Sequence, residues 1–161
     1  MSSVTASAQV AATPREFFDA TLAVDQIPGY AEWHPAFANG AIRIIKLTEG
    51  VGTTFDFELQ GTGATAHAEV REYAPERFVV WMSGGIFARG VATWTAVPRG
   101  ASCTVTYDFD YRPRFQPFGI IIDLLMLRPR LRRLAEDVVE ACKQRAEAHA
   151  ARVGTPEPAL E

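Results

Sequence analysis

The sequence predicts an α+β domain made of one strand, two short helices, six further strands and a long C-terminal helix. Three observations support this order. Apolar and polar residues alternate in strand-length runs between residues 3 and 111, as in half-buried strands. Six of these runs follow one another with only short turn signals between them, which predicts an antiparallel meander. After residue 127 apolar residues recur every three and four positions, the period of an amphipathic helix.

Length and composition are typical of one soluble globular domain. The chain has 161 residues, of which 48% are hydrophobic and 22% charged, and its net charge is −3. We expect one domain over residues 1–152 and a flexible tail over 153–161, since neither a linker nor a repeat divides the chain. The negative charge argues against nucleic acid as a partner.

The cysteines and the apolar stretches indicate a cytoplasmic protein with reduced thiols. Cys103 and Cys142 are far apart and form no CxxC motif, and the sequence shows no secretory signal peptide. The longest strongly apolar stretch, residues 118–127, is interrupted by Asp123 and is too short to cross a bilayer as a helix.

The first strand is predicted over residues 3–12. Its apolar residues share one face: Val4, Ala6, Ala8 and Val10.

The first helix has a clear start signal. Thr13 is suited to the cap position, Pro14 to the first helical position, and Glu16 three residues after the cap completes a capping box. This helix is predicted to run to about Leu22. A second short helical piece within residues 29–37 is predicted to break at Pro35.

Six strand-length runs follow, separated by glycine- and proline-containing turns. They cover residues 41–49, 53–61, 64–73, 77–85, 90–97 and 101–111.

The C-terminal helix is predicted from a period of three to four in its apolar residues and is expected to stop at Gly154 and Pro156. Its apolar stripe consists of Leu127, Leu131, Leu134, Val138 and Cys142.

This order of elements and three local motifs resemble a known superfamily. The motifs are the opening helix with its Trp-x-Pro corner in residues 13–37, the glycine-containing turn into a strand in residues 49–59, and the proline-containing turn in residues 70–81. Together with the terminal helix they resemble the SRPBCC superfamily, specifically its polyketide cyclase/dehydrase and lipid-transport branch, which is related to START domains and to the birch-pollen-allergen fold. The likeness covers roughly residues 3–150.

The resemblance implies a helix-grip fold, in which a curved antiparallel seven-stranded sheet surrounds the long helix and leaves an apolar cavity for a hydrophobic ligand. The leading function it implies is that of a polyketide cyclase/dehydratase. The alternative is a non-catalytic lipid or isoprenoid binding or transfer protein, and a third is an interaction module whose own side chains fill the cavity. The fold alone does not decide among them.

Strand alternation and the Trp-x-Pro corner select the candidate ligand-binding residues. Ala66 and Ala68 either leave space for a ligand or let the long helix approach closely, and Trp94 serves either as a ligand platform or as core. Arg89 is expected in a loop, as a contact for an acidic ligand group or as a plain surface arginine. The candidate set is Trp33, Phe55, Phe57, Ala66, Ala68, Arg89, Trp94, Tyr107, Phe109 and Tyr111.

The candidates for catalysis are Tyr107, Tyr111 and His34. A buried phenol can polarise a ligand carbonyl, or its hydroxyl can simply be satisfied by the backbone. His34 lies in the corner formed by Trp33 and Pro35. We expect it to be partly exposed and non-catalytic, the alternative being a base at the cavity mouth.

Neither a metal nor another cofactor is expected. The three histidines have no acidic or thiol partner at ligand spacing, and His67 is expected on the solvated outer face of the sheet. Nucleotide-binding and serine-hydrolase motifs are absent from the sequence.

Residues 112–133 combine an apolar stretch with flanking arginines. The arginines are Arg112, Arg114, Arg128, Arg130, Arg132 and Arg133. The favoured interpretation is that this segment closes one end of the cavity. The alternative is a transient contact with anionic lipid or an acidic carrier protein during ligand exchange.

Overall fold

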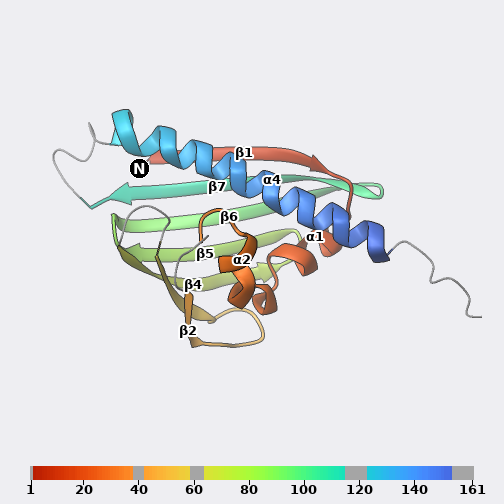
Figure 1. The fold of residues 1–161 in the computed structure, drawn as a ribbon, viewed down its shortest axis with the longest axis horizontal. Helices are drawn as coiled ribbons and strands as arrows, with labels where there is room; N and C mark the ends of the chain where they lie inside the picture. The colour runs from red at the N-terminus through yellow and green to blue at the C-terminus, as the bar shows by residue number, and fades with distance from the viewer. Residues whose placement is uncertain (1, 38–41, 59–63, 115–122, 154–161) are drawn as a thin grey trace, which may run out of the picture.

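The structure is a computed structural model that describes residues 2–37, 42–58, 64–114 and 123–153. Seven strands form one antiparallel sheet (Figure 1), in the spatial order β1, β7, β6, β5, β4, β3, β2. The predicted seven strands and the meander are confirmed, with the first strand paired to the last. The strands are β1 (Ser2–Val10), β2 (Ile42–Lys46), β3 (Thr54–Glu58), β4 (Thr65–Ala74), β5 (Arg77–Gly84), β6 (Phe87–Arg99) and β7 (Ser102–Pro113).

One strand begins earlier than predicted. Gly84 and Gly85 have φ angles of 97° and 62°, a conformation that favours glycine, and they reverse the chain tightly. β6 therefore begins at Phe87 rather than at Gly90, and Arg89 lies within a strand. The expectation of a loop position for Arg89 is wrong for this reason.

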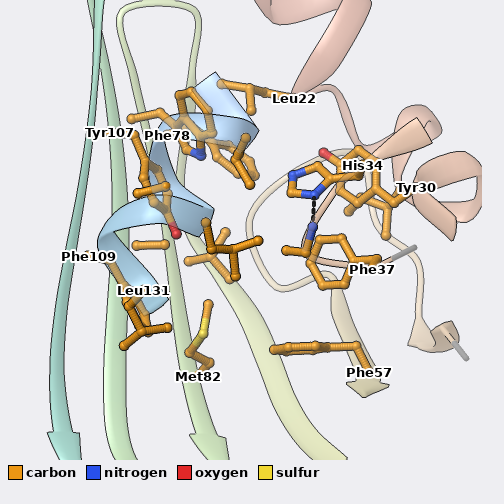
Figure 2. Close-up of a pocket in the computed structure, with 18 of the residues that line it drawn as sticks. Leu22, Tyr30, His34, Phe37, Phe57, Phe78, Met82, Tyr107, Phe109 and Leu131 are labelled. Atoms are coloured by element: carbon orange, nitrogen blue, oxygen red, sulfur yellow. Dashed lines mark hydrogen bonds between the residues drawn. The ribbon is translucent and has the colours of Figure 1, made fainter. Parts of the chain in front are cut away.

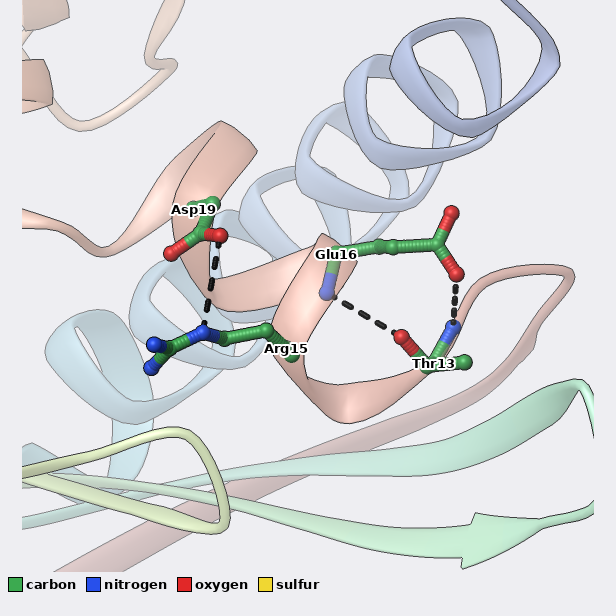
Figure 3. Close-up of polar contacts among 4 residues, drawn as sticks. All are labelled: Thr13, Arg15, Glu16 and Asp19. Carbon is green, nitrogen blue, oxygen red and sulfur yellow. Dashed lines mark hydrogen bonds and ion pairs between the residues drawn. The ribbon is translucent and has the colours of Figure 1, made fainter. Parts of the chain in front are cut away.

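Helix α1 (Pro14–Thr21) begins with the predicted capping box (Figure 3). Thr13 Oγ1 accepts a hydrogen bond from the Glu16 backbone N–H at 3.2 Å, and Glu16 Oε1 accepts one from the Thr13 N–H at 3.2 Å. The nearby ion pair between Arg15 and Asp19, at 3.7 Å, is exposed and contributes little to stability.

A 3₁₀ turn, η1 (Val24–Gly29), and the short helix α2 (Tyr30–Trp33) follow α1 and stand over the β3 and β4 side of the sheet. The Val24 N–H donates to Tyr73 Oη of β4 at 2.9 Å, and Phe37 packs edge-on against Phe57 of β3 at 5.1 Å between ring centroids. The second helical piece ends before Pro35, as predicted.

The long helix α4 (Arg128–Val153), preceded by the π-helical turn η2 (Asp123–Leu127), runs along β1 and β7 (Figure 1). Its C-terminal half is held by Arg145, which donates to the Ala20 carbonyl at 3.0 Å and lies 4.6 Å over the Trp33 ring. On the inner face of the sheet, the helix therefore covers the β1 and β7 edge, and η1 and α2 cover the region of β3 and β4. Within the described ranges, no helix is both long and apolar enough to cross a membrane.

Candidate functional site

A cavity of about 90 Å³ lies between the N-terminal half of α4 and the inner face of the sheet (Figure 2). Helix α4 contributes Leu131, Leu134, Ala135 and Val138 to its wall, and the strands and α2 contribute most of the aromatic side chains. The aromatic residues in the wall are Tyr30, Phe37, Phe55, Phe57, Phe78, Phe87, Trp94, Tyr107 and Phe109.

The position of the two covering layers explains the cavity. Helix α4 rests on β1 and β7, while the pairs Val24–Tyr73 and Phe37–Phe57 hold the other layer on β3 and β4. Side chains from both layers leave a gap in the middle. Its volume admits several water molecules or about one ring of a ligand, and ordinary ligand pockets measure roughly 300–1,000 Å³. A larger ligand must therefore displace wall side chains, of which the unbranched Met82 is the most adaptable.

The cavity wall is uncharged. Every described residue that lines it is apolar except Tyr30, His34, Trp94 and Tyr107. The Tyr30 hydroxyl is already used, because it donates to the Thr21 carbonyl at 2.7 Å. The remaining polar groups are one imidazole, one indole and one phenol.

His34 is buried, with 8% of its surface exposed. Its Nδ1 accepts a hydrogen bond from the Ala36 backbone N–H at 3.2 Å (Figure 2). The rings of Tyr30 and Phe37 enclose the imidazole at centroid distances of 4.8 and 4.6 Å. Burial lowers the pKa of His34 to about 3, since the charged form loses its hydration. The expectation of a partly exposed histidine is wrong, because the aromatic corner folds over it, and an imidazole with this pKa is a poor base at neutral pH.

Tyr107 lies in the cavity wall with its ring 4.7 Å from that of Trp94. Burial raises the pKa of the Tyr107 hydroxyl, which therefore stays protonated at neutral pH. Neither this hydroxyl nor the Trp94 indole N–H has a hydrogen-bond partner in the part of the chain that the structure describes.

Comparison with known protein families assigns the chain to one of them. The model of the family described as polyketide cyclase / dehydrase and lipid transport matches residues 1–147. The chain belongs to this family. A comparison with curated protein sequences gives no match.

Solved structures of other proteins share the fold of this polyketide cyclase/dehydrase family member. The Zhui aromatase/cyclase from Streptomyces sp. R1128 is 16% identical, with a TM-score of 0.74 over 96% of this chain and 99% of that chain. A norcoclaurine synthase point mutant from Thalictrum flavum is 19% identical, with a TM-score of 0.70 over 92% of this chain and 95% of that chain. A START superfamily protein from Mycobacterium smegmatis is 18% identical, with a TM-score of 0.64 over 94% of this chain and 98% of that chain. These likenesses establish the helix-grip fold.

Half of the candidate ligand-binding residues lie in the cavity wall, namely Phe55, Phe57, Trp94, Tyr107 and Phe109. The other half lie elsewhere, namely Trp33, Ala66, Ala68, Arg89 and Tyr111. Binding by any of them stays a prediction.

The two alanines lie on the inner face of the sheet but do not line the cavity. The register pairs Ala68 with Phe55 on one side and with Met82 on the other. These larger side chains project further from the sheet than a methyl group does and separate the alanines from the cavity.

The other three residues have different surroundings. Arg89 lies on the outer face of the sheet, 4.8 Å from the Trp81 ring centroid. Tyr111 is fully buried and stacks on Phe109 at 5.5 Å, while Trp33 packs against the Arg145 guanidinium.

Several wall residues were not among the candidates. The strand run 77–85 has apolar residues on both faces, so its alternation does not reveal that Phe78, Val80 and Met82 face inward. The helical period did mark Leu131, Leu134 and Val138 as a buried face, and that period was the available signal for the α4 wall.

Metal ligands do not gather anywhere in the described residues. His67 lies on the outer face, where its Nδ1 is 2.7 Å from Asp56 Oδ1. Its predicted position is confirmed.

The segment before α4 is described only in part, because residues 115–122 lie outside the described ranges. Leu125 and Met126 in η2 are 70% and 61% exposed. The interpretation of this segment as a cavity plug is therefore wrong for Leu125, which faces away from the core. Contact with a membrane or a carrier protein stays a prediction.

Proposed function

We propose that this family member binds a neutral, mainly hydrophobic small molecule in the cavity under α4. The observation that carries the proposal is the wall itself: aromatic and aliphatic side chains enclose a space, and the described wall residues include no charged group. Such a site favours transfer of apolar surface from water and penalises an ionised ligand, which would lose its hydration without gaining a partner.

The size of the cavity favours a compact ring over an extended acyl chain. A volume of about 90 Å³ holds roughly one ring, and a long chain would have to displace side chains along much of the core. Lipid transport, the other activity in the family description, therefore ranks below binding of a ring-containing molecule.

Cyclisation or dehydration of a polyketide-like substrate is a second candidate. The Tyr107 hydroxyl, which lines the cavity and has no partner in the described chain, favours it, as do the family description and the aromatase/cyclase among the fold relatives. Neither His34 nor Tyr107 changes protonation near neutral pH. Any chemistry here would depend on holding a chain folded, excluding water and polarising a carbonyl by a hydrogen bond.

A one-ring hydrocarbon, α-methylstyrene, tests the binding proposal in an NMR titration of the purified protein. We expect shifts that saturate and concentrate on Val80, Leu131 and Val138 of the wall. Ala135→Phe should weaken binding at least about tenfold, because the new ring fills the space. The matched control is Ala148→Phe, on an exposed position of the same helix, which should leave the affinity unchanged. An unmodified protein with no saturable shifts would refute the proposal.

Native mass spectrometry of the purified protein gives an independent test. We expect a co-purifying molecule that is neutral and contains a ring. A co-purifying long-chain lipid would instead favour the transport function.

A further inference from the structure

The polar groups of the cavity wall that lack a partner among the described residues can all donate a hydrogen bond. We infer that the cavity selects a neutral ring compound of the ketone or quinone class, whose carbonyl oxygens accept hydrogen bonds from His34 Nε2 and from the Tyr107 hydroxyl. This inference rests on the proposed binding function and adds the chemical class of the ligand.

The His34 hydrogen bond to the backbone determines which ring nitrogen carries the proton. A backbone N–H can only donate, so Nδ1, which accepts from Ala36 at 3.2 Å, is unprotonated. The neutral imidazole therefore carries its proton on Nε2. In the described chain Nε2 has no partner, and His34 lines the cavity.

Tyr107 and Trp94 supply donors from the sheet. Their rings lie 4.7 Å apart, and both residues line the cavity. The phenol of Tyr107 can donate or accept, whereas the indole of Trp94 can only donate. Figure 2 shows His34 and the Tyr107 hydroxyl on opposite sides of the space that the wall residues enclose. A ring with an oxygen at one or both ends matches this arrangement.

Other ligand classes fit this set of donors less well. A hydrocarbon in the cavity leaves these donors unpaired, which is costly once water has been displaced. An amine adds further donors where acceptors are scarce. A carboxylate has acceptors but needs a cation, and none is among the described wall residues. A carbonyl oxygen accepts two hydrogen bonds and carries no charge.

Two conservative variants test the inference with a matched pair of ligands, acetophenone and α-methylstyrene, which differ by C=O against C=CH₂. Tyr107→Phe removes only the hydroxyl. His34→Asn keeps an acceptor for the Ala36 N–H, as in an Asx-turn, but has no atom at the position of Nε2. Because the two donors lie on opposite sides of the cavity, the single carbonyl of acetophenone reaches only one of them. We expect the variant that removes this donor to weaken acetophenone about fivefold relative to α-methylstyrene. The quantity to compare between the wild type and each variant is the ratio of the dissociation constants of the two ligands. This comparison removes the difference in water solubility of the ligands.

The outcomes separate the two proposals. If α-methylstyrene binds every protein and both variants keep the wild-type ratio of dissociation constants, the carbonyl inference is wrong and the binding function stands. If neither ligand binds the unmodified protein, both fail.

A measurement on the unmodified protein covers the case in which a variant does not fold. Long-range ¹H–¹⁵N spectra should show His34 protonated on Nε2, with that nitrogen shifting when 1,4-cyclohexanedione, a one-ring diketone with an oxygen at each end, is added. A proton on Nδ1, or an Nε2 signal insensitive to the diketone, would overturn the inference.

Discussion

The two halves of α4 present the same kind of side chain to different surroundings. Ala135 and Ala146 are both buried, at 2% and 0% exposure, and they lie on one face because eleven residues make about three helical turns. Ala135 lines the cavity. Ala146 is absent from the cavity wall, and its neighbour Glu147 accepts a hydrogen bond from the Ala11 N–H, just after β1, at 3.0 Å.

Burial alone therefore does not locate the site. The exposed fractions of the two alanines are nearly equal, but only Ala135 lines the cavity. In the N-terminal half of α4, here called the hollow half, the cavity wall opposite the helix includes His34 and Tyr107. The C-terminal half, here called the packed half, lies near small apolar and thiol side chains, among them Cys103 and Cys142, which are buried. The C-terminal half of α4 contacts α1 and the Trp33 ring through Arg145, whereas the N-terminal half faces the cavity.

The largest expected effect concerns the neutral imidazole of His34 in the cavity wall beside the hollow half. The pKa of His34 is about 3 in the folded protein and about 6.5 when unfolded, so the unfolded chain binds the extra proton between these values. The free energy of unfolding should fall as the pH drops below 6.5, by on the order of 3 kcal/mol from this residue at pH 4.

Urea unfolding of the wild type and of His34→Asn measures this contribution. At pH 7.5 the two proteins differ only by packing and hydrogen bonding. The gap between them should shrink or reverse toward pH 4, because the variant has no imidazole to protonate. If the difference in free energy of unfolding between the two proteins stays constant with pH, the cavity wall does not hold a neutral His34 imidazole.

A smaller effect tests the difference in free space directly. Ala146→Leu should reduce the free energy of unfolding by about 1–3 kcal/mol, because three carbons must enter a filled region. Ala135→Leu should cost less than about 1 kcal/mol, because its side chain extends into the cavity. Equal losses in chemical denaturation would mean that the two halves of α4 are packed alike.

The smallest effect concerns the surface just before the hollow half. Replacing Leu125 and Met126 together by serine should change the free energy of unfolding by no more than about 0.5 kcal/mol, since both side chains are exposed. If this turn and the exposed Arg130, Arg132 and Arg133 contact lipid phosphates, the wild type should cosediment with anionic vesicles at low salt and the double variant should not. Absence of cosedimentation by the wild type at low salt would remove the membrane contact.

Local patterns in the sequence were sufficient for the elements themselves. The capping box at Thr13 and Glu16, the break before Pro35 and the change of period near residue 127 each depend on neighbours within a few positions. Strand alternation also placed Phe55, Phe57, Tyr107 and Phe109 on the inner face, because the pleat turns successive side chains to opposite faces.

Only the tertiary structure decided which inner-face residues meet the cavity. Ala66 and Ala68 share that face with Phe55, Phe57 and Met82, yet the larger neighbours reach the cavity and the methyl groups do not. His34 follows the same logic, because its burial and its pKa come from the way the aromatic corner closes over it. Alternation and helical period specify the direction of a side chain, whereas free space and dielectric environment depend on segments distant in sequence that fold against it.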